Sequence, residues 1–285
     1  MAINKFWKIL AKEIDLEFED FNLASKVVDR PASDCSFEKI ALIWNDFKGN
    51  VRKFTFGDLS SRTSEFASGL KSLGVKKGDR IFIYMEKVPE VYIAILAVIK
   101  AGAIVCPLFS GFGKTAIFDR MYDGSPVAII TTSSLCLNVF EISEKIESLK
   151  HIVVYSPTPK SFPVSAGPAQ VIDFCELYIS ANEFNPEPMK TDDYSLIHYT
   201  SGTTGKPKGA VHSHGALLGQ YYSTREVFKI NEDDIYWCTA DPGWITGTSH
   251  GIFGPWLNNA TQVVYEGGFD ASMWYDFIQR NRVTI

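Results

Sequence analysis

The sequence predicts an α/β fold in which parallel sheets are flanked by helices. From residue 54 onward, short apolar segments alternate with longer segments whose apolar residues follow helical spacing. The short segments are apolar throughout, which is typical of strands buried on both faces and therefore of a parallel sheet covered by helices. The chain has 285 residues, 46% of them hydrophobic, which is enough for a large core.

Local signals place the individual elements. Asp58 is the expected N-cap of a helix that Gly74 closes, and Pro89 begins a helix that ends at Ala101-Gly102. The N-terminus has apolar residues at helical spacing and no cleavable signal segment. The predicted helices cover residues 1–14, 58–73, 89–100, 114–122, a stretch between 132 and 150, 216–228 and 271–281. The predicted strands cover residues 54–56, 80–84, 103–108, 127–131, 151–155, 195–199, 234–238 and 261–265.

Two segments depart from this alternation. Six prolines between residues 156 and 193 predict a surface excursion around one short helix or strand. Residues 282–285 have the pattern of the first half of a buried strand, and we therefore expect the chain to be a fragment of a longer protein. We divide it into a lead-in over residues 1–74, an α/β subdomain over 75–225, and the start of a second α/β subdomain over 226–285.

Charge and cysteine content exclude several classes of protein. The net charge is −5, from 28 basic and 33 acidic residues, so nothing in the composition favours nucleic acid or an anionic membrane as a partner. The apolar run over residues 91–106 is too short to span a bilayer and is interrupted by Lys100. The five cysteines form no C-x-x-C pair, so we expect neither a zinc knuckle nor a disulfide framework, and we predict a cytoplasmic protein.

The segment from Thr200 to Gly209, Thr-Ser-Gly-Thr-Thr-Gly-Lys-Pro-Lys-Gly, has the chemistry of a phosphate-binding loop. Three glycines allow close approach of the backbone to an anion, four hydroxyls can donate hydrogen bonds, and two lysines add positive charge. The loop follows an apolar strand, where open α/β sheets place their ligands. It is not a Walker A motif, because Pro207 interrupts the required spacing. The alternative is an ordinary polar loop.

The run from Tyr199 to Gly209 resembles the signature phosphate loop of the adenylate-forming enzymes, a superfamily that includes acyl-CoA synthetases. The resemblance implies that the chain is part of the large N-terminal domain of such an enzyme. It also implies that the loop holds the β- and γ-phosphates of ATP while a carboxylate attacks the α-phosphorus. The positions carried over as ATP phosphate contacts are Thr200, Ser201, Gly202, Thr203, Thr204, Gly205, Lys206 and Lys208.

A second segment, from Tyr236 to Ser249, is similar to the second core motif of acetyl-CoA synthetases. By this likeness, the pocket for the carboxylate and for the pantetheine of CoA is lined by Trp244, Ile245, Thr246 and Gly247. The alternative is that Trp244 and Ile245 are simply core residues. Arg120 matches an arginine that contacts the 3′-phosphate of CoA in such enzymes, and the alternative for Arg120 is a surface helix charge.

The resemblance, which runs from about Phe21 to the C-terminus, implies an AMP-forming acetate–CoA ligase that converts acetate, ATP and CoA to acetyl-CoA, AMP and pyrophosphate. Relatives also use Mg²⁺, but its ligand and the catalytic residues belong to motifs absent from this sequence. We therefore assign neither a metal ligand nor a catalytic residue, and we expect the isolated chain to be inactive. Two alternatives stay open: a medium-chain acyl-CoA synthetase, and a non-catalytic nucleotide-binding half that needs a complementary C-terminal polypeptide.

Overall fold

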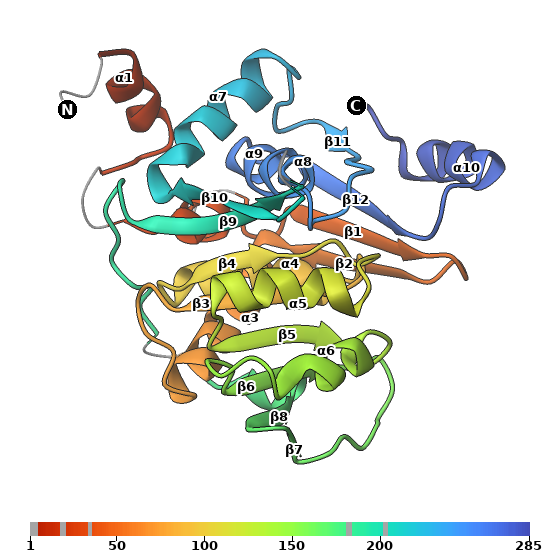
Figure 1. Cartoon of the computed structure of the whole chain (residues 1–285). Helices are drawn as coiled ribbons and strands as arrows, with labels where there is room; N and C mark the ends of the chain where they lie inside the picture. The colour runs from red at the N-terminus through yellow and green to blue at the C-terminus, as the bar shows by residue number, and fades with distance from the viewer. Residues whose placement is uncertain (1–4, 18–20, 34–35, 181–183, 202–204) are drawn as a thin grey trace.

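The structure is a computed structural model that describes residues 5–17, 21–33, 36–180, 184–201 and 205–285. Within these residues the strands form two sheets, and helices pack between and around them (Figure 1). The predicted α/β class is confirmed. In the described part of the chain, no helix combines the length and the apolar character needed to cross a membrane.

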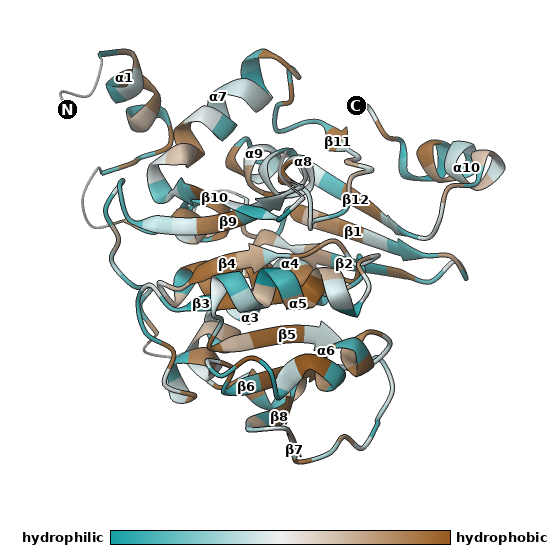
Figure 2. Ribbon diagram, in the orientation of Figure 1, coloured by the Kyte–Doolittle hydropathy of each residue, from teal (hydrophilic) through white to brown (hydrophobic). Residues whose placement is uncertain are grey.

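The larger sheet has eight strands in the order β10-β9-β4-β3-β5-β6-β8-β7. Its inner strands are parallel, and only the pairs β10–β9 and β7–β8 at its edges are antiparallel. Hydrophobic residues run along β3, β4 and β5, as Figure 2 shows, because helices cover both faces. The strands are β3 (Arg80–Tyr84), β4 (Ile104–Pro107), β5 (Ala128–Thr132), β6 (His151–Tyr155), β7 (Ser165–Ala166), β8 (Ala169–Asp173), β9 (Tyr194–Thr200) and β10 (Lys208–Ser213).

The smaller sheet joins distant parts of the chain. Its order is β11-β12-β1-β2, and β1 pairs with β12 in parallel, with Ile43 opposite Val263. The sequence did not predict β1, and it predicted only the end of β2. The four strands are β1 (Ile40–Asp46), β2 (Val51–Thr55), β11 (Ile235–Tyr236) and β12 (Thr261–Glu266).

The helices between the sheets carry most of the core. Every residue of α4 is buried, because this helix packs against α3 and both sheets. The Nε1 of Trp44 on β1 donates to the carbonyl of Lys87, just before α4. The helices are α1 (Lys5–Glu13), α2 (Arg30–Ser33), α3 (Phe56–Ser72), α4 (Pro89–Lys100), α5 (Lys114–Gly124), α6 (Cys136–Ser143), α7 (Leu217–Glu226), α8 (Ile245–Thr248), α9 (Gly254–Leu257) and α10 (Ala271–Asn281), with short turns η1 (Ser25–Asp29), η2 (Phe174–Leu177), η3 (His214–Ala216) and η4 (Ser249–Phe253).

Several predicted elements are confirmed to the residue, among them β3, β6, α4 and α10. The predicted N-cap of α3 is wrong. Thr55, not Asp58, caps the helix: the Thr55 hydroxyl accepts from the Asp58 amide at 3.0 Å, and the Asp58 carboxylate accepts from the Thr55 amide at 2.9 Å. The two residues form a capping box, in which the acidic residue stands at the third helical position.

Two other predictions need correction. The proline-rich segment contains more than one short element, because β7 and β8 add two strands to the edge of the larger sheet. The last four residues are not a buried strand. Thr284 and Ile285 make backbone hydrogen bonds to Ile235 and Trp237, but Ile285 is 40% exposed. The division of the chain into three segments stays a prediction.

Two local features of the core matter below. The ammonium of Lys100, at the end of α4, is fully buried and lies 2.5 Å from a carboxylate oxygen of Asp29. It also donates to the Ser64 hydroxyl at 2.9 Å and to the Ser60 carbonyl at 3.1 Å. Gly69 of α3 passes so close to Leu177 that a Cβ there would lie 2.2 Å from the Leu177 carbonyl oxygen.

Candidate functional site

The candidate phosphate loop joins β9 to β10 as the turn of an antiparallel hairpin. Thr200 pairs with Lys208 and Tyr199 with Gly209. The Thr200 hydroxyl donates to the Lys208 carbonyl at 3.5 Å, which closes the base of the loop. Because β9 is parallel to β4, the loop starts at the carboxyl edge of the sheet, where α/β folds bind ligands.

The described residues of the loop present their polar groups to solvent. Thr200, Ser201, Lys206 and Lys208 are all exposed. Gly205 has a φ of +82°, a conformation that favours glycine, and no atom lies within 4 Å of the place of a Cβ. The loop therefore presents the Ser201 hydroxyl and the ammonium groups of Lys206 and Lys208 to solvent, while the Thr200 hydroxyl is bonded to the Lys208 carbonyl. The predicted contacts Gly202, Thr203 and Thr204 lie outside the described residues, and all the phosphate contacts stay predictions.

Tyr199 fixes one face of β9 to α5. Its hydroxyl donates to a carboxylate oxygen of Asp123 at 2.8 Å. Burial, together with this hydrogen bond, raises the pKa of Tyr199, so the phenol is neutral. Gly124 leaves room for the contact, since a Cβ there would lie 2.8 Å from the Tyr199 hydroxyl.

His198 fixes the opposite face of β9 to α8. Its Nε2 lies 2.7 Å from the Thr248 hydroxyl oxygen, and the residue is 4% exposed. Burial lowers the pKa of His198 to about 3, assisted by the nearby His212, while a hydrogen bond with the backbone of Gly243 opposes the shift. The imidazole is therefore neutral at physiological pH.

The turn that begins at Asp241 is held by its own carboxylate. One oxygen accepts from the Gly243 amide and the other from the Ser110 hydroxyl, both at 2.7 Å. Burial raises the pKa of Asp241, which is 9% exposed. A Cβ on Gly243 would lie 2.2 Å from the Phe109 amide nitrogen, so the turn packs directly on the chain that follows β4.

The predicted carboxylate segment is exposed. Trp244 is 45% and Ile245 41% exposed, so the alternative that these two are core residues is wrong. Thr246 is exposed as well, whereas Gly247 is buried. A Cβ on Gly247 would lie 2.0 Å from the Asp241 carbonyl oxygen, so glycine is required there for packing of the backbone. The role of these residues in a pocket stays a prediction.

Aromatic rings connect Trp244 to Arg120. The Trp244 ring lies 5.4 Å from that of Phe109 and 6.1 Å from that of Phe112. The guanidinium of Arg120 lies 4.2 Å from the centre of the Phe112 ring, within the range of a cation–π contact. Arg120 is 9% exposed, so the alternative of a surface helix charge is wrong. Its Nη1 donates to the Ala116 carbonyl at 2.7 Å, and burial lowers its pKa.

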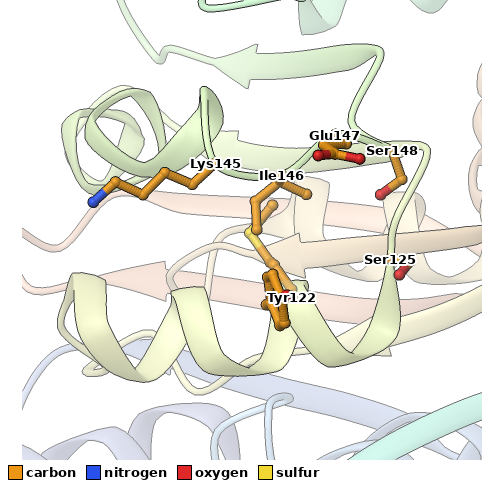
Figure 3. A pocket seen from close by; sticks show the side chains of 7 residues that line it. Tyr122, Ser125, Lys145, Ile146, Glu147 and Ser148 are labelled. Carbon is orange, nitrogen blue, oxygen red and sulfur yellow. The ribbon is translucent and has the colours of Figure 1, made fainter.

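Cavities occur beside the loop and away from it. One of about 230 Å³ lies under the hairpin and is lined by Arg80, Asp123 and Tyr199, among others. Another of about 580 Å³ lies between α5 and the segment that follows α6, and its lining includes Tyr122 and Ile146 (Figure 3). None of the predicted site residues lines the second cavity. Among the described residues, no three His, Cys, Asp or Glu side chains are arranged to hold a metal ion.

Three residues that hold β9 in place were not predicted, namely His198 and its partner Thr248, and Asp123, the partner of Tyr199. One signal was available for His198. His198 is the one ionisable imidazole in a strand whose other residues are apolar or carry a hydroxyl. A buried histidine usually has a hydrogen-bond partner, so its place in the strand indicates one. The identity of the partner was not accessible, because Thr248 lies 50 positions further along the chain.

Comparisons with known proteins agree with the two motifs. The chain matches the AMP-binding enzyme family over residues 28–285. It is 38% identical over 266 residues to the acetyl-coenzyme A synthetase of Bacillus subtilis, covering 93% of this chain and 45% of that protein. It is 34% identical over 325 residues to the acetyl-coenzyme A synthetase of Pyrobaculum aerophilum, covering 99% of this chain and 48% of that protein. The solved structure of an acyl-CoA synthetase from Brucella canis matches with a TM-score of 0.84 and 28% sequence identity, covering 93% of this chain and 46% of that one. The chain thus spans less than half the length of these relatives.

Proposed function

Because the chain belongs to the AMP-binding enzyme family, we propose that it supplies the ATP-binding part of an AMP-forming acyl-CoA synthetase whose carboxylate is acetate. One observation carries this proposal. The loop with exposed Thr200, Ser201, Lys206 and Lys208 starts on a strand that is hydrogen-bonded, through His198, to the helix that follows Trp244. The names of the relatives support acetate.

The proposed reaction has two steps. A carboxylate oxygen attacks the α-phosphorus of ATP, the bond from that phosphorus to the bridging oxygen breaks, and pyrophosphate leaves. The sulfur of CoA then attacks the acyl carbon, and AMP leaves. In the first step the hydroxyls of Thr200 and Ser201 and the ammonium groups of Lys206 and Lys208 would hold the β- and γ-phosphates. Their contribution is positioning and stabilisation of charge on the leaving pyrophosphate.

Mg²⁺ supplies charge neutralisation on ATP phosphates when it is bound. Among the described residues, no three His, Cys, Asp or Glu side chains are grouped so that they could hold the ion, and we derive no step through it. The contact between Arg120 and a phosphate of CoA stays a prediction. In the structure the guanidinium lies on the Phe112 ring. A cytoplasmic location and a complementary C-terminal polypeptide stay predictions as well.

Trp244 and Ile245 would form the wall that limits the acyl chain. Stacking on two phenylalanines gives the Trp244 ring a fixed position, and a fixed wall discriminates by size. One methylene in an apolar pocket changes transition-state binding by about 1–3 kcal/mol. A series of acids from acetate to octanoate therefore distinguishes acetate activation from the alternative of a medium-chain enzyme.

The test is carboxylate-dependent exchange between ATP and labelled pyrophosphate, measured on this chain and on the chain extended to the length of its relatives. We expect exchange with acetate in the extended protein. Lys208→Ala should lower kcat/KM by roughly ten- to a hundredfold, the loss of a charge-assisted hydrogen bond. The control is Lys53→Ala, which removes an exposed lysine on β2. Exchange with octanoate but not acetate would overturn the substrate, and ATP binding without any exchange would favour a non-catalytic half.

A further inference from the structure

Two consecutive side chains hold β9 immediately before the phosphate loop. Side chains of neighbouring residues in a strand point to opposite faces of the sheet. Tyr199 reaches Asp123 on α5, and His198 reaches Thr248 on α8. The start of the loop at Thr200 is therefore anchored from both faces of the sheet.

His198 makes a second contact besides its hydrogen bond with Thr248. Its ring hydrogen-bonds the backbone of Gly243 as well as the hydroxyl of Thr248. These two partners are the residues directly before and directly after the segment 244–247. One imidazole thus holds both ends of the exposed segment that carries Trp244 and Ile245.

In the described part of the chain, His198 is not placed to act on a substrate directly. The ring is buried, with 4% of the residue exposed, and its nitrogen partners belong to the protein. The buried imidazole of His198 has a fixed position, so it can hold other parts of the site in place. The segment 244–247 forms the N-terminal end of a helical stretch, since α8 continues directly into η4 and α9. Trp244 gives this end no side-chain cap, and the first turn of a helix leaves backbone amides without intrahelical partners, so contacts from outside the helix help to fix its position.

We propose that His198 is a positioning residue that fixes the carboxylate segment 244–247 relative to the phosphate loop. This inference rests on the proposed function for what the two parts bind, but the contact itself is independent of any activity. The two substrates must meet at the α-phosphorus, so a fixed distance between the loop and the segment determines how well the carboxylate is aligned.

The test uses variants that separate the two contacts of the ring. His198→Leu removes both, and Thr248→Val removes one. In His198→Gln the side-chain amide nitrogen takes the place of Nε2, so it keeps the hydrogen bond to Thr248. The matched control is Thr224→Val, which removes the 3.3 Å hydrogen bond between another buried threonine, Thr224, and the half-buried His250.

The first readout does not need activity. The protein is labelled with 5-fluorotryptophan, and the ¹⁹F resonance of Trp244 is assigned by its loss in Trp244→Phe. We expect this resonance to shift or broaden in His198→Leu and Thr248→Val, to recover largely in His198→Gln, and to be unchanged in Thr224→Val. An unchanged Trp244 resonance in His198→Leu overturns the inference.

The second readout is exchange kinetics on the extended protein. We expect the KM for the carboxylate to rise roughly fivefold in Thr248→Val and in His198→Leu, and the double variant to be no worse than the worse single variant, because both changes remove one shared hydrogen bond. The KM for ATP should change less than twofold, since Tyr199 still holds the loop. Equal effects on both KM values would overturn the inference. Absence of exchange in the unmodified protein would remove the proposed function and leave the fluorine result to decide the inference.

Discussion

The buried ion pair between Lys100 and Asp29 offers a sharp test of the core. Asp29→Ala leaves a fully buried ammonium with only the Ser64 hydroxyl and the Ser60 carbonyl as partners. Removing one member of a buried pair costs about 3–5 kcal/mol, because the remaining charge is desolvated without compensation. We expect a loss of this size in the free energy of unfolding, measured by urea denaturation at pH 7.

An exposed pair provides the control. Lys114 and Glu141 are 2.7 Å apart, a distance similar to that of the buried pair, but their side chains are 59% and 56% exposed. Glu141→Ala should therefore cost less than about 1 kcal/mol. Equal losses in Asp29→Ala and Glu141→Ala would refute the reasoning, because they would mean that burial of Lys100 does not amplify the loss of its partner.

The pH dependence gives a second signature. Burial lowers the pKa of Lys100, and Asp29 partly restores it. Without Asp29 the pKa of Lys100 in the folded chain falls further below its value in the unfolded chain. Between these two pKa values Lys100 is protonated only in the unfolded chain, and this pH range becomes wider. Stability rises with pH in such a window, by up to about 1.4 kcal/mol per pH unit. The deficit of Asp29→Ala should therefore shrink from pH 7 to pH 9, and a constant deficit would contradict this explanation.

Three further predictions concern stability and use the same denaturation assay. Gly69→Ala should lower the free energy of unfolding by several kcal/mol, since the new Cβ would lie 2.2 Å from a carbonyl oxygen. Gly219→Ala on α7 meets no atom within 4 Å and should raise it by about 0.5–1 kcal/mol. A gain in both variants would refute the packing argument. Thr55→Ala removes the capping box of α3 and should cost about 1 kcal/mol, and no loss would mean that the cap is dispensable. Burial lowers the pKa of His198 to about 3 and that of His214 to about 4, so only the unfolded chain binds these protons between pH 6.5 and about 4. Stability should fall as the pH drops through that window, by roughly 1.4 kcal/mol per unit for each histidine, and His198→Gln should reduce the slope.

The elements with strong local signals could be predicted from the sequence. Pro89 at the start of α4 and the Ala101-Gly102 end define that helix without any tertiary information. The phosphate loop was recognisable for the same reason, because its glycines, hydroxyls and lysines are contiguous. The exposure of Trp244 could not be predicted, since a tryptophan beside an isoleucine fits a core equally well.

Elements that depend on distant partners were missed. β10 has a mostly exposed surface and no apolar run, and it is a strand because β9 lies beside it. β1 was not predicted either, although residues 40–44 form an apolar run; the part that no local pattern specifies is its parallel pairing with β12, from the other end of the sequence. The contact of His198 with Thr248 has the same cause, as no local pattern specifies which side chain 50 positions away will accept or donate the bond.

The pairing of β1 with β12 also determines the order in which the protein can be assembled on a ribosome. Thr261 hydrogen-bonds to Ile40, 221 positions earlier in the chain. At a synthesis rate of roughly 5–20 residues per second, β1 leaves the ribosome about 10–40 s before β12 does. Throughout that interval the edge of β1 that pairs with β12 has no strand beside it, although β2, α3 and α4 have already been synthesised. The nascent chain therefore presents a strand edge that a chaperone must shield or that a neighbouring chain can capture.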